Sequence, residues 1–276
     1  MSQTQPSPAP GDAGPAPAPA DELAQARQQI ADMAAAQEAF MRRVVHDLRA
    51  PLRHVTSYGA LVRELLGELQ QPPAQIAEAL ECVATMEQSA RRMAAMLEGL
   101  RAIAEVARAP LRCAAVDPAA LAQQARAQLE GRVAGRAVQW AIQERMPPVQ
   151  ADPALLRSVF EQLLDNALKF SRGRDPARIQ VAAEVQGSHV RITVQDNGAG
   201  FDPARAQALF GVFERLHRES EFEGVGAGLA LCRAIAQRHG ASIEASAVPG
   251  QGCVIELDWP AAGDIDSGAS RPASSI

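Results

Sequence analysis

Hydrophobic residues recur at helical spacing through the first part of the chain. From Asp21, a plausible N-cap, apolar positions follow a seven-residue repeat typical of a coiled-coil helix. Steps of four residues within 40–52 interrupt this repeat, which locally unwinds a coiled coil. The pair Pro72-Pro73 ends the first helix, and the pattern predicts a second helix from Ala74. An isolated hairpin cannot bury both apolar stripes, so residues 21–109 are predicted to form a dimeric four-helix bundle. Packing of the hairpin on the rest of the chain is the alternative.

Beyond Pro110 the pattern changes to strands that alternate with helices. Strands are expected near residues 111–116, 137–143, 178–185, 189–195, 242–247 and 253–258, and helices near 118–130, 152–171 and 229–239. Asp152-Pro153 supplies an N-cap with proline at the first helical position. A long glycine-containing loop, 198–228, precedes the last helix. The alternation predicts an α+β fold, one mixed sheet covered by helices, over residues 110–260.

Composition limits the classes of function. Residues 1–20 and 261–276 are small and polar, and we predict that both are disordered tails. A net charge of -5 offers no basic field, so neither nucleic acid nor a membrane surface is an expected partner. Four scattered cysteines fit reduced thiols. The sequence shows neither a membrane-spanning run nor a secretory signal, and we expect a cytoplasmic protein.

A histidine with a carboxylate beside it, His46-Asp47, lies on the first predicted helix. Helical geometry turns His46 away from the apolar positions Val44 and Leu48 towards water. Pro51 removes a backbone hydrogen bond and kinks the helix nearby. Most surface histidines only interact with solvent, so a reactive role for His46 depends on the chemistry of the rest of the chain.

Asn166 and Lys169 form the first polar cluster of the second part. They lie three residues apart on the predicted helix after Asp152, so they share a face. An amide oxygen can ligate Mg²⁺, which retains waters and shares phosphate oxygens, and a lysine can contact phosphate. Polar pairs of this kind are also common on amphipathic helices without any ligand.

The second cluster, Asp196-Asn197-Gly198-Ala199-Gly200, ends an alternating strand. Its glycines permit positive φ and close approach of the backbone to a ligand. A carboxylate at a strand end can accept a hydrogen bond from an exocyclic amine. An ordinary strand-ending turn is the alternative interpretation.

The third cluster, Gly224 to Gly228, has glycines at alternate positions and leads directly into a helix at Leu229. Free backbone N–H groups and the positive end of a helix together form a site for phosphate. The spacing matches neither the GxGxxG of dinucleotide folds nor the GxxxxGK[ST] of a P-loop.

In this order the clusters resemble the ATP-binding domain shared by histidine kinases, the Hsp90 chaperone, DNA gyrase and MutL, the GHKL or Bergerat type. Asn166 matches the asparagine box, 196–200 the first glycine box and 224–228 the second. Phe210 to His217 matches the box of the nucleotide lid, and His46 to Leu52 is the box that distinguishes histidine kinases. The residues in these two boxes are most similar to those of phytochrome-associated soluble kinases.

This resemblance, which extends from Asp21 to Pro260, implies a sensor histidine kinase of two-component signalling. The expected reaction is ATP-dependent autophosphorylation of His46, followed by transfer to an aspartate on the receiver domain of a response regulator. Asp47 would hydrogen-bond the second ring nitrogen of His46, fix its tautomer and stabilise the developing charge. The predicted catalytic residues are therefore His46 and Asp47.

The resemblance also implies the cofactors ATP and Mg²⁺ and assigns their ligands. Asn166 would hold Mg²⁺, Lys169 would contact phosphate and Asp196 would bind the adenine amine. The full set of expected nucleotide-binding residues is Asn166, Lys169, Asp196, Gly198, Gly200, Arg215, Gly224, Gly226, Gly228 and Leu229. His217 is a further candidate in the lid.

Two positions depart from the family pattern. Members commonly carry a second asparagine one turn before the first, and here that position is Gln162, a second candidate for the metal. Many members place Thr or Asn four residues after the phosphorylated histidine, where it orients water for dephosphorylation of the partner. Here that residue is Ala50, so we predict weak or absent phosphatase activity.

Partners and alternatives follow from the same comparison. We expect a homodimer, a response regulator and, because only one heptad helix precedes His46, input through that helix or from a separate sensor protein. The main alternative is a dimeric nucleotide-binding scaffold or phosphotransfer protein without kinase turnover, which Gln162 alone supports. A protein-serine kinase of the anti-sigma type would have no use for His46. Acid lability of the phosphate separates these classes.

Overall fold

The computed structural model describes residues 45–46, 48–49, 52–67, 74–133, 135–217 and 221–263. The chain divides into the units Met1–Val44 and Val45–Ile276, and every described residue belongs to the second unit. The predicted N-terminal tail, the coiled-coil entry at 21–44 and residues 264–276 lie outside the described residues. So do Asp47, Ala50, Pro51 and the pair Pro72-Pro73. The predicted C-terminal tail begins too early, because Ala261 forms a β-bridge with Val149 and Ala262 is only 4% exposed.

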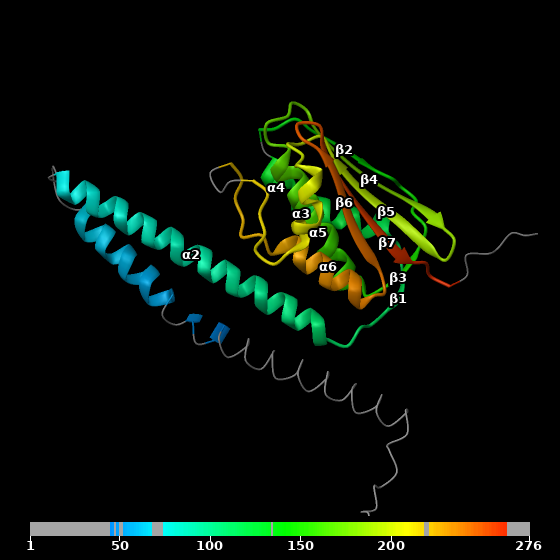
Figure 1. Ribbon diagram of the computed structural model, residues 1–276, viewed down its shortest axis with the longest axis horizontal. Helices are drawn as coiled ribbons and strands as arrows, with labels where there is room; N and C mark the ends of the chain where they lie inside the picture. The colour runs from blue at the N-terminus through cyan, green and yellow to red at the C-terminus, as the bar shows by residue number, and fades with distance from the viewer. Residues whose placement is uncertain are drawn as a thin grey trace, which may run out of the picture. The chain divides into compact units, whose positions relative to one another are not determined.

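A helical hairpin begins the described part of the chain (Figure 1). Residues 52–67 are helical, and α2 spans Ala74–Arg108, as its apolar pattern predicted. Arg49 Nη2 lies 3.1 Å from Glu98 Oε2, and Arg63 Nη1 lies 3.0 Å from Glu87 Oε2, so the two helices run antiparallel. None of the described helices combines the length and apolar content needed to cross a membrane.

A five-stranded mixed sheet in the order β2-β4-β5-β7-β6 forms the second part. Among the described strands, only β2 and β4 pair in parallel. The strands are β2 (Val138–Ile142), β4 (Ala177–Gln186), β5 (His189–Asp196), β6 (Ser242–Val248) and β7 (Gly252–Pro260). The main helices are α3 (Pro118–Gln128), α5 (Pro153–Phe170) and α6 (Gly228–Arg238), which cover one face of the sheet (Figure 1). The predicted mixed sheet covered by helices is confirmed.

The core of this domain lies between the sheet and α5. Asp152 caps α5, because its Oδ1 accepts hydrogen bonds from the N–H groups of Ala154 (3.0 Å) and Leu155 (3.3 Å). Pro153 occupies the first turn of the helix, where its missing N–H costs nothing. The buried face of α5 comprises Leu156, Val159, Phe160, Leu163, Leu164, Ala167 and Leu168. The polar residues on the opposite edge of the helix remain available to contact a ligand.

Three short elements differ from the sequence prediction. β1 (Ala114–Val116) pairs with β3 (Val149–Ala151) in a separate two-stranded sheet, and β3 was missed because three residues carry no periodicity. The 3₁₀ helix η1 (Pro203–Phe210) lies inside the predicted loop 198–228 and begins, like α5, at an Asp-Pro pair. The helix predicted over 118–130 ends at Gln128 and is followed by the single turn α4 (Glu130–Val133).

The last turn of α6 contacts the end of α2. Arg238 donates hydrogen bonds to the main-chain oxygens of Val106 (2.9 Å), Ala107 and Ala109 (2.7 Å). A guanidinium group at this place satisfies carbonyls that an α-helix leaves without partners at its C-terminus. α6 is thereby attached to the point where the hairpin leads into the sheet domain.

Candidate functional site

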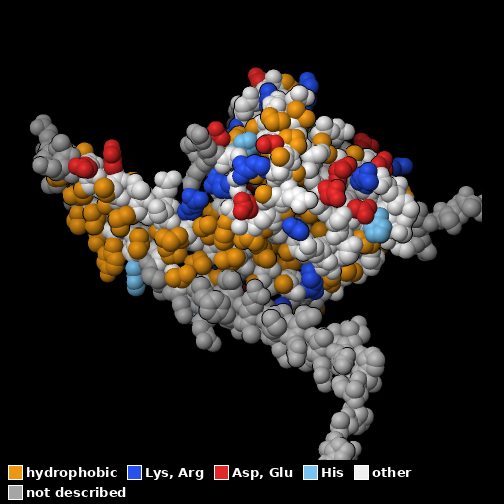
Figure 2. Space-filling view, in the orientation of Figure 1, with side chains coloured by type: hydrophobic (Ala, Val, Ile, Leu, Met, Phe, Trp, Pro, Cys, Tyr) orange, Lys and Arg blue, Asp and Glu red, His pale blue; other side chains and the backbone are white. Residues whose placement is uncertain are grey.

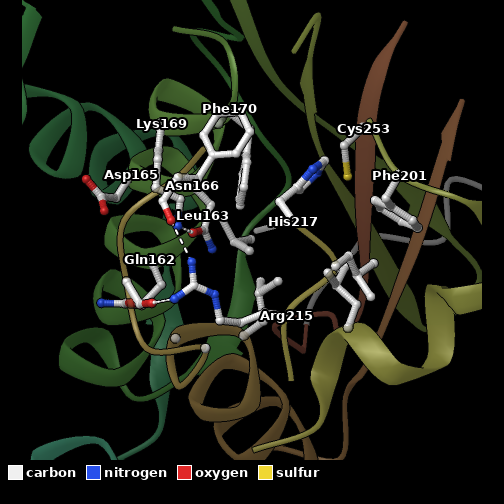
Figure 3. Close-up of a pocket in the computed structure, with 18 of the residues that line it drawn as sticks. Gln162, Leu163, Asp165, Asn166, Lys169, Phe170, Phe201, Arg215, His217 and Cys253 are labelled. Carbon is white, nitrogen blue, oxygen red and sulfur yellow. Dashed lines mark hydrogen bonds between the residues drawn. The ribbon is translucent and has the colours of Figure 1, made fainter. Parts of the chain in front are cut away.

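A cavity of about 320 Å³ lies between α5, the ends of β5 and β7, and the glycine loop before α6 (Figure 3). The predicted residues that line it are Gln162, Asn166, Lys169, Asp196, Gly200, Arg215, His217, Gly224, Gly226, Gly228 and Leu229. Gly198 is not among the lining residues. Segments more than 60 residues apart in sequence thus contribute to one concave site, as expected of a ligand pocket.

The polar edge of α5 forms one wall of the cavity. Lys169 Nζ donates to Asn166 Oδ1 at 3.1 Å, and it also lies 4.3 Å from the centre of the Phe170 ring. Burial, together with the positive charge of Arg215, lowers the pKa of Lys169 to about 8. A lysine that is desolvated and surrounded by cations gains strongly from a bound anion.

Gln162 lies one turn before Asn166 and faces the start of α6. A Cβ atom placed on Gly228 would be 2.3 Å from Gln162 Oε1, so glycine is what lets this amide oxygen approach the helix start. Two amide oxygens from α5 therefore border the cavity. Among the described residues, no group of three His, Cys, Asp or Glu side chains could hold a metal.

The opposite wall is mostly apolar and carries one carboxylate. Asp196, at the end of β5, accepts hydrogen bonds from the backbone N–H groups of Gly198 (2.7 Å) and Cys253. Burial nevertheless raises the pKa of Asp196 to about 6. Apolar side chains around it include Val194, Phe201, Leu209 and Ile255. A single hydrogen-bond acceptor in an apolar slot suits a flat heterocycle that carries an amine.

Three glycines that line the cavity, Gly200, Gly224 and Gly226, have φ angles that other residues rarely adopt, and at two of them a Cβ atom would also clash with the backbone. Gly200 has φ 63°, and a Cβ atom there would lie 2.2 Å from the carbonyl oxygen of Val248. Gly226 has φ 76°, and its Cβ would lie 2.6 Å from the carbonyl oxygen of Glu214. Both positions therefore require glycine for the backbone packing itself.

The N-terminus of α6 opens onto the same cavity. Its N-cap is Ala227, which makes no side-chain capping hydrogen bond, and both Ala227 and Gly228 line the cavity. The N–H groups of the first turn therefore keep their capacity to bind an anion, and the helix dipole adds to it. Together with Lys169, this end of the cavity is suited to phosphate.

Some lining residues were not predicted from the sequence. Phe170 packs against His217 and Phe222, with ring centroids 5.3 and 4.8 Å apart. Cys253 and Ile255 come from β7, where they could not be distinguished from the residues of any buried strand. Apart from Leu229, which follows the second glycine cluster, the apolar lining residues carry no motif, so only the fold brings them to the site.

His46 does not line the cavity. Its side chain is exposed, whereas the neighbouring Val45 is 4% exposed. The exposure of His46 agrees with the prediction that it turns towards water, but Leu48, which was expected on the apolar side, is itself 46% exposed. Asp47, its predicted partner, lies outside the described residues.

The family model described as histidine kinase-, DNA gyrase B- and HSP90-like ATPase matches residues 151–263. These residues are thus similar to the ATPase domains of that family. The match covers α5, Asp196, both glycine clusters and β7, which are the elements that enclose the cavity. The likeness in sequence also extends into the helical hairpin.

Over 241 residues the chain is 28% identical to the phytochrome-like protein Cph1 of Synechocystis, an alignment that covers 87% of this chain and 31% of Cph1. It is 30% identical over 242 residues to the adaptive-response sensory kinase SasA of a Synechococcus strain, covering 86% of this chain and 63% of SasA. These relatives confirm the resemblance to sensor histidine kinases. The chain spans about a third of the length of the phytochrome-like relative.

The fold agrees with that of a solved structure. Full-length ShkA matches with a TM-score of 0.57 and 23% identity over 80% of this chain and 45% of ShkA. The shared fold supports the arrangement of sheet and helices.

Proposed function

We propose that the protein is an ATP-dependent protein-histidine kinase that phosphorylates its own His46 and passes the phosphoryl group to an aspartate of a response regulator. The observation that carries this proposal is the cavity of the ATPase domain, which combines Asp196, the Asn166–Lys169 pair and the uncapped start of α6. An exposed histidine on a helix of the same chain provides the acceptor.

ATP fits the two ends of the cavity. Ionised Asp196 would accept a hydrogen bond from the adenine amine, while Val194 and Ile255 would contact the ring. Lys169 and the N–H groups at the start of α6 would hold the phosphates. Arg215 lines the same cavity and adds a further positive charge.

Mg²⁺ fits the oxygen donors of α5. The amide oxygens of Gln162 and Asn166 border the cavity, and Mg²⁺ prefers such oxygen ligands while it retains waters and phosphate oxygens. When bound, the ion would neutralise charge on the phosphates during transfer. Gln162 would hold it from the position where related kinases carry a second asparagine.

In the proposed reaction a neutral ring nitrogen of His46 attacks the γ-phosphorus. The bond between that phosphorus and the β,γ-bridging oxygen breaks, ADP leaves and an N–P bond forms. Asp47 would accept a hydrogen bond from the second ring nitrogen and stabilise the positive imidazolium until it loses its proton. The phosphoryl group then passes to an aspartate oxygen of the receiver domain.

A second copy of the chain would complete the helical bundle. Leu48, Val55 and Val62 recur every seven residues, and their side chains are 46%, 36% and 41% exposed. Met86 and Met93 repeat with the same spacing on α2 and are also exposed. Figure 2 shows the resulting hydrophobic surface along the hairpin. Such repeats are typical of helices that pack against helices, so we propose a homodimer. In this dimer residues 21–109 form the dimerisation and phosphotransfer domain, and residues 110–260 form the catalytic domain.

The decisive experiment is incubation of the purified protein with Mg²⁺ and ATP labelled on the γ-phosphate. The product is divided between acid and alkali, because phosphohistidine is lost in acid and kept in alkali. His46→Gln should remove the label, and the matched control His54→Gln, at another exposed histidine of the same hairpin, should keep it. Acid-stable label, or acid-labile label that persists in His46→Gln, would refute the assignment.

A further inference from the structure

Glu223 bridges two arginines at the edge of the nucleotide cavity. Its Oε1 lies 3.3 Å from Arg132 Nη2 and also accepts a hydrogen bond from Arg172 Nη2. Arg132 belongs to α4, whereas Arg172 follows the end of α5. Glu223 itself lines the cavity. A single carboxylate oxygen of Glu223 therefore holds two guanidinium groups at the edge of the cavity.

The backbone around Glu223 is positioned by contacts that do not involve its charge. Arg215 donates to the main-chain oxygens of Phe222 (2.6 Å) and Gly224. The ring of Phe222 packs on Phe170 at 4.8 Å. Neutralising Glu223 would therefore remove the ion pairs while leaving these contacts in place.

These groups lie at the phosphate end of the cavity. Arg132 also pairs with Asp165, a cavity residue next to Asn166. Figure 3 shows Asp165 and Lys169 on the side of the cavity opposite Cys253. Cys253 pairs with Asp196 across β5 and β7 and so marks the adenine end.

The same charged groups affect the pKa of Lys169. Burial and the charge of Arg215 are the main causes of the lowered pKa of Lys169; Glu223 opposes them, and Arg172 and Arg132 lower the pKa a little further. Two arginines, a lysine and a carboxylate therefore share one electrostatic environment. An anion that bound here would compete with the Glu223 carboxylate for Arg132 and Arg172.

We propose that Arg132 and Arg172 form an outer phosphate-binding pair, which Glu223 occupies in the nucleotide-free protein and from which the γ-phosphate of ATP displaces it. This inference rests on the proposed function. Carboxylate and phosphate oxygens accept hydrogen bonds from guanidinium groups in the same way. Glu223 is 59% exposed and Arg172 44%, so the exchange costs little. ADP lacks the terminal phosphate and leaves Glu223 in place, so the pair discriminates ATP from ADP.

The test measures affinities of the purified full chain for MgATP and MgADP by titration calorimetry. Glu223→Gln should tighten MgATP binding about threefold, because one like charge near the phosphate is removed, and should leave MgADP unchanged. Arg132→Gln with Arg172→Gln should weaken MgATP about tenfold through lost charge-assisted hydrogen bonds, again without an effect on MgADP. In that background Glu223→Gln should bring no further gain.

Glu221→Gln is the matched control, because it makes the same charge change two residues away, beside His217. An equal gain in Glu221→Gln, or an unchanged ratio of MgATP to MgADP affinity in the Glu223 and arginine variants, would overturn the outer pair while leaving nucleotide binding intact. A wild-type protein that bound neither nucleotide would instead refute the proposed function and the outer pair with it.

Discussion

The carboxylate of Asp196 accepts a 2.7 Å hydrogen bond from the backbone N–H of Gly198, two residues further along the chain. This contact, with a second from Cys253 N–H, favours the charged carboxylate. Burial opposes them and is the larger effect, so the pKa of Asp196 rises to about 6. Its ionisation therefore falls within a range of pH that is easily measured.

Adenosine affinity should fall as the pH decreases through 6. The ionised carboxylate is the better acceptor for the adenine amine, and a raised pKa means that the acid form dominates below about 6. With a pKa of about 6, the ionised fraction of Asp196 falls about tenfold between pH 7 and pH 5. We therefore expect the affinity for adenosine to fall about tenfold over the same interval. Calorimetry with adenosine is suitable, because adenosine has no phosphate that titrates in this range.

Asp196→Asn is the control for this titration. It should bind adenosine more weakly at pH 7 and show a flat profile between pH 5 and pH 7. An equally flat profile for the wild-type protein would contradict the role of Asp196.

Gly200→Ala should destabilise the protein more than Gly187→Ala. The φ angles are nearly equal, 63° and 61°, so both substitutions cost about 1–2 kcal/mol for a left-handed backbone. Only at Gly200 would the new Cβ clash with a carbonyl oxygen, that of Val248, whereas nothing lies within 4 Å at Gly187. We expect an additional loss of about 1–3 kcal/mol for Gly200→Ala, measured by urea unfolding. Equal losses would show that the Val248 contact carries no cost.

Val55→Glu should convert a dimer to monomers. Val55 is 36% exposed and belongs to the seven-residue repeat of the hairpin. In a dimeric bundle the introduced glutamate would be buried without a partner, which would destabilise the dimer. Val185→Glu makes the same change at a 45% exposed position of β4 and should leave the mass unchanged. Light scattering after gel filtration measures both. A wild-type protein that is monomeric at micromolar concentration would refute the proposed bundle.

Ala50→Thr should introduce phosphatase activity. Alanine offers no group to orient a water molecule, whereas a threonine hydroxyl can accept and donate hydrogen bonds. The measurement is the lifetime of phosphate on a receiver domain that the chain itself has phosphorylated, in the presence of ADP. Ala50→Val supplies a matched shape without the hydroxyl and should behave as the wild type. Rapid dephosphorylation by the wild-type protein would contradict the prediction.

The sequence was most informative where local chemistry and periodicity agree. α5 was predicted between Asp152 and Ser171 because an Asp-Pro cap precedes a regular apolar face, and it spans Pro153–Phe170. β5 was predicted because Val190, Ile192 and Val194 alternate with polar residues, and these three side chains are buried. β3 and η1 were missed because they are too short or too irregular to leave a pattern.

Apart from Leu229, the site was predictable only in its polar and glycine residues. Asn166, Lys169 and Asp196 belong to motifs, whereas Cys253 and Ile255 resemble any strand residues. The pairing of Glu223 with Arg132 and with Arg172 joins positions 91 and 51 residues apart. Surface arginines and glutamates are too frequent for such a pairing to be recognised without the fold.

One helix links the nucleotide cavity to the hairpin. α6 starts at Gly228 in the glycine loop and ends at Arg238, whose guanidinium group holds the carbonyls at the end of α2. Eleven residues make a stiff rod about 16 Å long, so a displacement at one end is transmitted to the other. The coupling is reciprocal. If bound ATP changes the free energy needed to move α2, then movement of α2 changes the free energy of ATP binding by the same amount. A stimulus acting on the hairpin would be measurable as a change in nucleotide affinity, even before any phosphoryl group is transferred.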